Sequence, residues 1–170
     1  VSRMDRTIAE VNQSLENFEL GEAQQKLYDF IWNDFCDWYI EMAKIRLRSG
    51  SEPSPLPTLA HVLERTLRLL HPFMPFITEE VWQNLLPRLP RQDNMPESIM
   101  IAPYPTADSP RQDRQAEEEI ALVMQAIRAV RNTRAQLHIP ANQYLPAIVE
   151  ADGMQSTIQE EAEVIRALSR

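Results

Sequence analysis

The sequence predicts a mainly α protein, in which an antiparallel helical bundle over residues 1–105 is followed by a small helix–strand–helix appendage over residues 106–170. Three observations predict this class. Apolar residues recur every three or four positions over most of the chain, which is the period of one helix face. Prolines gather between these periodic segments, where they end helices. Only the run from Tyr144 to Ala151 reads as a strand, and Pro146 makes it an edge or irregular one.

Composition narrows the class of protein further. The 170 residues fit one domain with a small appendage, and 44% of them are hydrophobic, enough for a core. The net charge is −8, so RNA or DNA could be bound only through a local basic stripe or with help from other domains. Cys36 is the single cysteine, which excludes an internal disulfide. We find no apolar run long enough to cross a membrane and no signal peptide, so we expect a cytoplasmic protein without membrane contact.

The first helix is predicted from the first residue onward. Its apolar positions are spaced by three and four: Val1, Met4, Ile8, Val11, Leu15 and Phe18. No helix start signal precedes Val1, and the helical period still runs at Leu168 near the other end. We therefore expect the chain to be part of a longer protein.

A second helix is predicted from Glu22 to Arg48, with Gly21 at its start. Its apolar face comprises Leu27, Phe30, Ile31, Phe35, Trp38, Met42 and Ile45. The segment 49–57 ends it, because three prolines in nine residues cannot lie inside a helix.

Two shorter helices follow in the predicted bundle. Thr58 is expected to cap a helix that runs to Leu70, and Thr78 to cap the next one. After a proline-rich loop, residues 98–102 read as a short extended run.

The predicted appendage begins with a fifth helix. Ser109, Pro110 and Gln112 fit a capping box at its start, and it runs to about Leu137. After the predicted strand and a turn at residues 152–153, Ser156 and Gln159 fit a second capping box before the last helix.

Catalytic chemistry finds little support in this sequence. Neither Gly-rich phosphate-loop pattern is present, and Cys36 has no histidine near it in sequence, which is typical of a buried small hydrophobe. Glu79 and Glu80 are neighbours in the first turn of a helix, where acidic residues favour the helix dipole. We predict no catalytic residue and no metal ligand.

Binding residues are better supported, and each group has two interpretations. The rings of Trp32, Phe35, Trp38 and Tyr39 either pack between helices, or one of them reaches the surface and stacks on a base. Arg128, Arg131 and Arg134 are spaced by three and form either a solvated face or a rail for phosphates. Arg3 and Arg6 make a smaller basic pair on the first helix.

Four segments resemble bacterial valyl-tRNA synthetases, which are class I aminoacyl-tRNA synthetases. They are FIWNDFCDWYIEMAKIRL (30–47), HPFMPFITEEVWQNL (71–85), ESIMIAPYP (97–105) and VRNTRAQLHIPANQYLPAIV (130–149). The second segment is shared with the isoleucine and leucine enzymes, whereas FCDWY and RNTR point to valine. The sequence departs from the family pattern at Ile45, Gln136 and Ala141, where proline, glutamate and proline are usual.

The resemblance implies the anticodon-binding region of an ATP-dependent ligase that charges its tRNA with valine. The fragment itself is then expected to be non-catalytic and without a cofactor, because ATP belongs to the full-length enzyme. Its expected partners are valine tRNA and the catalytic and editing domains of the same polypeptide. A monomer is expected, and a C-terminal coiled coil would follow Arg170.

The resemblance also implies candidate contact residues. By position in the family, the first helix and the end of the bundle hold anticodon bases, which here means Arg3 and Arg6 and the run Ile99, Met100 and Ile101. An aromatic side chain of the second helix, Tyr28, Trp32 or Phe35, is expected to stack on a base.

Two other readings stay open at this point. The chain could be the anticodon-binding domain of an isoleucyl or leucyl enzyme, or a helical module that binds proteins and never touches RNA. Salt distinguishes the last case, because RNA binding weakens steeply with salt and apolar docking does not.

Overall fold

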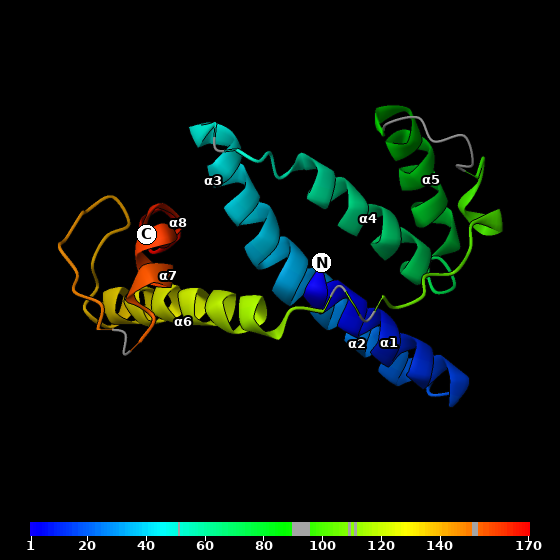
Figure 1. The fold of residues 1–170 in the computed structure, drawn as a ribbon, viewed down its shortest axis with the longest axis horizontal. Helices are drawn as coiled ribbons and strands as arrows, with labels where there is room; N and C mark the ends of the chain where they lie inside the picture. Colours follow the sequence, from blue (N-terminus) through cyan, green and yellow to red (C-terminus); the bar gives the residue numbers. More distant parts are fainter. Residues whose placement is uncertain (51, 90–95, 109, 111, 151–152) are drawn as a thin grey trace. The chain divides into compact units, whose positions relative to one another are not determined.

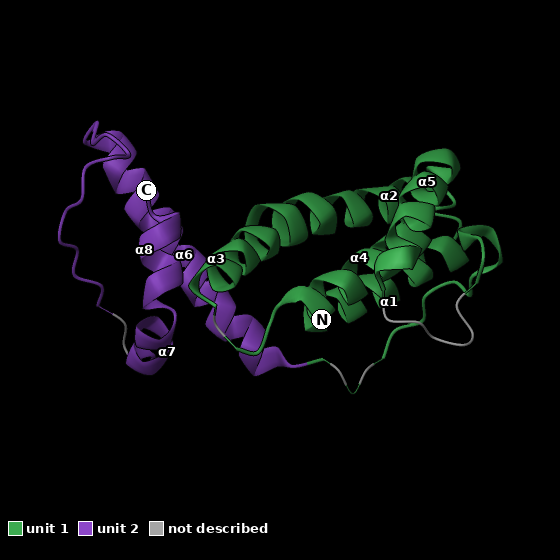
Figure 2. Ribbon diagram, turned by 90° about the horizontal axis from the view of Figure 1, so that it is seen from above, with its two compact units in different colours: residues 1–112 green, residues 113–170 purple. Residues whose placement is uncertain are grey.

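The computed structural model describes residues 1–50, 52–89, 96–108, 110, 112–150 and 153–170. The protein is mainly helical, as the apolar periods predict (Figure 1). It divides into two compact units, unit 1 over residues 1–112 and unit 2 over residues 113–170 (Figure 2).

Unit 1 begins with α1 (Ser2–Glu16) and a long, continuous helical stretch. That stretch consists of α2 (Leu20–Asp29), the π-helical segment η1 (Phe30–Ile40) and α3 (Glu41–Ser49). It matches the second predicted helix, although it starts before Gly21, so the prediction of Gly21 as its start is wrong. Gly50 ends it in the left-handed conformation, with φ of +68°, which glycine adopts without strain.

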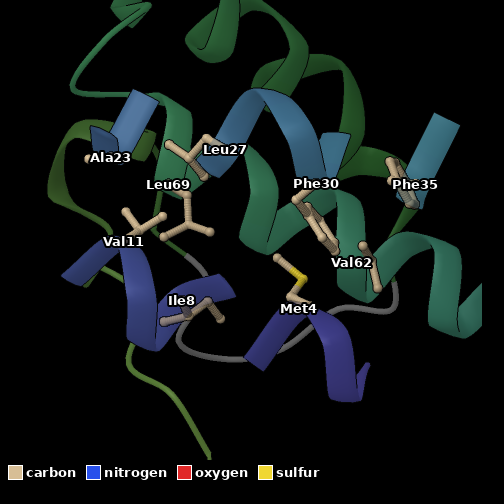
Figure 3. Packing of buried hydrophobic residues seen from close by; sticks show 9 residues of the cluster. All are labelled: Met4, Ile8, Val11, Ala23, Leu27, Phe30, Phe35, Val62 and Leu69. Atoms are coloured by element: carbon tan, nitrogen blue, oxygen red, sulfur yellow. The ribbon is translucent and has the colours of Figure 1, made fainter. Parts of the chain in front are cut away.

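The first core lies where α1 packs on α2 and η1. Figure 3 shows Met4, Ile8 and Val11 of α1 pointing toward the buried side chains of α2, η1 and α4. Lys26 Nζ lies 2.6 Å from Ser14 Oγ, and Arg3 Nε lies 3.0 Å from Asp34 Oδ2. These two contacts join opposite ends of the two elements, so α1 runs antiparallel to α2 and η1.

Two residues of the predicted first apolar face lie outside this core: Val1, which is 46% exposed, and Phe18. Phe18 is 90% exposed and has a φ of +59°, because α1 ends at Glu16 and the chain turns there into α2. The helical period of the sequence continues past the end of the helix, so Phe18 does not lie on the face of α1 that its spacing predicts.

Two further α-helices of unit 1 are α4 (Leu56–Leu70) and α5 (Pro75–Leu85). Both start before their predicted caps, because prolines occupy their first turns, where no backbone N–H is needed. Thr58 and Thr78 therefore lie inside these helices. The Thr78 hydroxyl donates to Met74 O at 2.8 Å, inside the first turn of α5.

A second, smaller core joins α4 and α5 to the end of unit 1. Trp82 of α5, Leu67 of α4 and Ile99 are its buried members. The short 3₁₀ helices η2 (Leu86–Arg88) and η3 (Ile99–Ile101) flank the undescribed residues 90–95. Residues 99–101 are thus helical, and the predicted extended run at 98–102 is wrong. Ser98 caps η3, with its Oγ accepting from Met100 N at 3.1 Å.

The connector after η3 lies along α1 and α4. Arg68 Nη1 donates to Pro103 O at 2.9 Å, and Asn12 Nδ2 donates to Pro105 O at 3.0 Å. Tyr104 is half-buried beside α4, and burial raises the pKa of its phenol to about 12. Side chains of two helices therefore fix the path of residues 103–108.

Unit 2 consists of α6 (Arg114–Gln136), α7 (Gln155–Glu160) and α8 (Ala162–Leu168). Asp113 caps α6, its side chain accepting from Ala116 N at 3.0 Å. The predicted capping box involves Ser109, which lies outside the described residues. Ser156 lies within α7 and makes no cap there, so the second predicted capping box is wrong, and two short helices replace the single predicted one.

The predicted strand is not formed in the part of its range that the structure describes. Residues 144–150 form neither a helix nor a strand that pairs with a neighbour, and Ile148 is 93% exposed. A strand is stabilised by its neighbours in a sheet, and the described part of unit 2 offers none. The helix–strand–helix prediction is therefore corrected to three helices and an irregular segment.

Candidate nucleic-acid interface

Two aromatic side chains lie on the outer face of α2 and η1. Tyr28 is 56% exposed and Trp32 is 51% exposed, while Ala23, Leu27 and Phe30 of the same stretch face the core. The ring centroids of Tyr28 and Trp32 are 6.1 Å apart and their planes are tilted by 52°. Exposed rings of this size can stack on an unpaired base, and we call this pair the aromatic platform.

Phe35, the third aromatic candidate, lies inside the protein. It is 6% exposed and stacks on Tyr39, with ring centroids 6.3 Å apart. Trp38 is buried as well, so most of the aromatic cluster packs between helices, as one of the two interpretations expected. Phe35 therefore presents no ring to a ligand.

The three candidate residues at the end of the bundle also differ in their exposure to solvent. Ile99 is buried against Leu67 and Trp82, whereas Met100 and Ile101 are 73% and 71% exposed. Only the two exposed residues are accessible to an RNA.

Glu79 of α5 holds this run in place. Its Oε2 accepts from Ser98 Oγ at 2.9 Å and from Ile99 N at 3.1 Å. A hydrogen bond from Gln83, assisted by those from Ser98 and Ile99, lowers the pKa of Glu79 against the opposing effect of burial. Glu79 therefore acts as an ionised anchor for η3. The prediction that Glu79 and Glu80 lie in the first turn of a helix is wrong, because α5 already begins at Pro75.

The two arginines of the basic pair on α1 differ in their exposure to solvent. Arg3 forms an ion pair with Asp34 of η1. Its side chain is still 54% exposed, so it can also reach a ligand. Arg6 lies on the next part of α1 and is half-buried.

The arginines of α6 bind the backbone of unit 2. Arg131 Nε donates to Leu168 O at 2.5 Å, and Arg134 Nη2 donates to Pro140 O at 2.6 Å and Gln143 O at 3.1 Å. Arg128 is exposed. Arg131 and Arg134, two of the three arginines predicted to contact phosphates, thus also hold the end of α8 and the turn after α6 against α6. Helical spacing alone does not reveal this role.

Three polar residues next to the platform were missed by the sequence reasoning. Gln25 Nε2 donates to Asp29 Oδ1 at 3.1 Å, and Asn33 Nδ2 lies 3.5 Å from the same oxygen. Their spacing of four residues places them in one row on the helix surface, and that spacing was the available signal.

Other chemistry is weakly supported by the described residues. Burial, assisted by the charge of Asp37, raises the pKa of the Cys36 thiol, so the thiol is protonated and a poor nucleophile at neutral pH. Among the described residues, no group of three histidine, cysteine or acidic side chains could hold a metal ion. Within the same residues, no helix is long and apolar enough to span a membrane.

The structure defines a helical domain that carries a pair of exposed aromatic rings on one surface. Comparison with known proteins gives the family. The model of the anticodon-binding domain of tRNA ligases matches residues 1–149. The chain belongs to this family of anticodon-binding domains.

Individual relatives agree with this family. A valine–tRNA ligase of Dehalococcoides mccartyi (strain CBDB1) is 46% identical over 171 residues, which covers all of this chain and 19% of the relative. The corresponding ligase of Geobacillus stearothermophilus is 47% identical over 143 residues, or 82% of this chain and 16% of the relative. A Bacillus cereus ligase is 44% identical over 89% of this chain. The chain spans about a fifth of the length of these curated relatives.

Proposed function

We propose that this chain is the tRNA anticodon-binding region of a longer, ATP-dependent valine–tRNA ligase. The observation that carries the proposal is the family match over residues 1–149, together with relatives named valine–tRNA ligase at 44–47% identity. In this proposal the chain recognises valine tRNA and other domains of the same polypeptide carry out ATP-dependent ligation and editing. The full protein is expected to be a cytoplasmic monomer, and no cofactor binds in this region.

Residues 1–105 are proposed to form the RNA-binding body, an antiparallel bundle, and residues 106–170 an appendage to it. The antiparallel contact of α1 with α2 and η1 supports this arrangement for the first helices. The connector at residues 103–108 leaves the bundle along α1 and α4.

The proposed RNA contacts are the exposed and half-buried candidates, and they lie in two groups, one in unit 1 and one in unit 2. Tyr28 or Trp32 stacks on a loop base, while Met100 and Ile101 provide apolar contact. Arg3 and Arg6 bind phosphates or base edges, and Arg128, Arg131 and Arg134 follow the backbone. Burial of Phe35 and Ile99 removes both from this set.

Electrostatics limit how the RNA is held. A chain of net charge −8 repels a polyanion at long range, so the arginines must act at short range. Stacking on the aromatic platform contributes about 1–3 kcal/mol per base and tolerates different bases. We therefore expect weak binding by the isolated chain, of which stacking supplies a large share.

A titration tests the proposal. The 170-residue chain is titrated into labelled valine tRNA and into the same tRNA with a scrambled anticodon loop, at low salt. We expect tighter binding of the valine anticodon, and Trp32→Ala weakens it about tenfold. Phe76→Ala is the matched control, because Phe76 is 90% exposed but lies on α5. Equal binding of both loops would overturn valine anticodon recognition, and preference for an isoleucine or leucine tRNA would reassign it.

A further inference from the structure

The polar row beside the aromatic platform has a defined orientation. Gln25, Asp29 and Asn33 are all exposed, and the side-chain NH₂ groups of Gln25 and Asn33 both point to Asp29 Oδ1. Tyr28 and Trp32 of the same helical stretch are exposed as well, whereas Leu27 and Phe30 are buried.

This orientation determines which atoms of the row can accept a hydrogen bond from a ligand. An ionised carboxylate only accepts hydrogen bonds, so the second oxygen of the exposed Asp29, Oδ2, is a further acceptor on this surface. Since each flanking amide donates toward Asp29, its carbonyl oxygen is directed away from Asp29 and adds an acceptor to the row. A base stacked on the platform therefore meets mainly acceptors at its edge.

A negative charge in this place fits a base edge better than a phosphate. Asp29 repels phosphate oxygens, so the RNA backbone is expected to pass on another side of the platform. Cytosine N4 and adenine N6 carry exocyclic amines that donate hydrogen bonds, and carboxylates accept from cytosine N4 in known recognition. Uracil has a carbonyl oxygen at the corresponding position and would oppose Asp29.

We propose that Asp29, oriented by Gln25 and Asn33, selects an unpaired base with an exocyclic amine on the aromatic platform, so that cytosine or adenine is preferred over uracil. The proposal rests on the proposed function, since it assumes that an RNA loop binds this face. It assigns a specificity role to three residues that neither the sequence motifs nor the family match identify.

Two hairpin RNAs test this proposal, one with a loop of uracils only and one in which a single cytosine replaces a loop uracil. Affinity of the 170-residue chain for each is measured by fluorescence anisotropy at low salt. We expect the wild type to prefer the cytosine loop about tenfold, as one base-edge contact supplies. Asp29→Asn, which turns an acceptor into a partial donor, is expected to reduce that preference below about threefold. Asn33→Asp, which removes the hydrogen bond from Asn33 to Asp29 and places a like charge beside it, is also expected to reduce that preference.

Glu10→Gln is the matched control, because it removes one exposed negative charge from α1 instead of α2. It should leave the cytosine preference unchanged, while melting curves confirm that each variant is folded. A wild type without preference, or an Asp29→Asn variant that retains the full preference, would overturn the role of Asp29 and leave RNA binding intact. Failure of both hairpins and of valine tRNA to bind would overturn the proposed function together with this inference.

Discussion

Asp5 is the most deeply buried carboxylate among the described residues of unit 1. It is 1% exposed, and its Oδ1 lies 3.1 Å from Arg65 Nη1 and accepts from Asp108 N at 3.3 Å. Arg65 also donates to Thr106 O at 3.4 Å. One buried ion pair thus joins α1, α4 and the connector.

Neutralising Asp5 is expected to destabilise unit 1 strongly. Asp5→Asn leaves the guanidinium of Arg65, which is only 18% exposed, without its counter-charge, and removing one partner of a buried pair costs about 3 kcal/mol. Urea denaturation followed by circular dichroism measures the change. Glu118→Gln, which breaks the exposed Arg114–Glu118 pair, should change the free energy of unfolding by less than about 1 kcal/mol. Equal effects of the two substitutions would show that the Asp5 pair is not buried in solution.

Glu79 is expected to make the stability of unit 1 depend on pH. The hydrogen bonds from Gln83, Ser98 and Ile99 hold the pKa of Glu79 below that of the unfolded chain. Its contribution is therefore present above the unfolded pKa, about 4.3, and is lost as the pH falls through the lower folded pKa. Glu79→Gln should melt at a lower temperature than the wild type at pH 7, and the gap should narrow below about pH 4. A gap that stays constant from pH 7 to pH 3 would contradict the ionised anchor.

At the residue scale, sequence reasoning found the right segments but not the orientation of each side chain. Trp32 and Phe35 are three positions apart, yet one is half exposed and the other buried. Because η1 is π-helical, with hydrogen bonds to the fifth residue, the faces there do not follow the 3.6-residue period used to assign them. The sequence carries no signal for that change of period.

At the scale of elements, the apolar periods predicted the long helices of unit 1 and the helix α6. Helix starts were less predictable, since Pro57 and Pro75 lie in the first turns and displace the caps expected at Thr58 and Thr78. The strand at residues 144–150 could not be judged from its own sequence, because a strand depends on a partner that the pattern does not name.

Alanine substitutions of two glycines at opposite ends of the long helical stretch should change the stability of unit 1 in opposite directions. Gly21 lies inside α2, and a Cβ there meets no atom within 4 Å, so Gly21→Ala should stabilise unit 1 by about 0.5 kcal/mol. Gly50 has a φ of +68° and equally open surroundings, so Gly50→Ala should cost about 1 kcal/mol through backbone strain alone. Thermal unfolding of the two variants compares them. Changes of the same sign would contradict the end of the helix at Gly50.

Substitutions of two arginines of α6 should have different effects, one on local stability and the other on RNA binding. Arg134→Ala removes two hydrogen bonds to Pro140 O and Gln143 O, so hydrogen exchange over residues 137–143 should accelerate. Arg128→Ala should leave that exchange unchanged and weaken RNA binding regardless of loop sequence. An Arg134→Ala variant with unaltered exchange would exclude its role in holding the turn.

At the scale of the whole molecule, the acidic balance and the proposed RNA partner are compatible only if contact is local. The basic residues lie in separate groups on α1 and α6, and the stacking surface lies on α2 and η1. We therefore expect an anticodon loop to lie on the outer face of α2 and η1.

Tryptophan fluorescence tests this claim most directly. Of the three tryptophans, Trp32 is 51% exposed, whereas Trp38 and Trp82 are 7% and 1% exposed. Acrylamide should therefore quench mainly Trp32. We predict that a saturating valine anticodon stem-loop, with binding verified by anisotropy of the labelled RNA, lowers the quenching of the wild type to that of Trp32→Phe. Unchanged quenching of the wild type with the RNA bound would show that the loop lies elsewhere and would contradict the account.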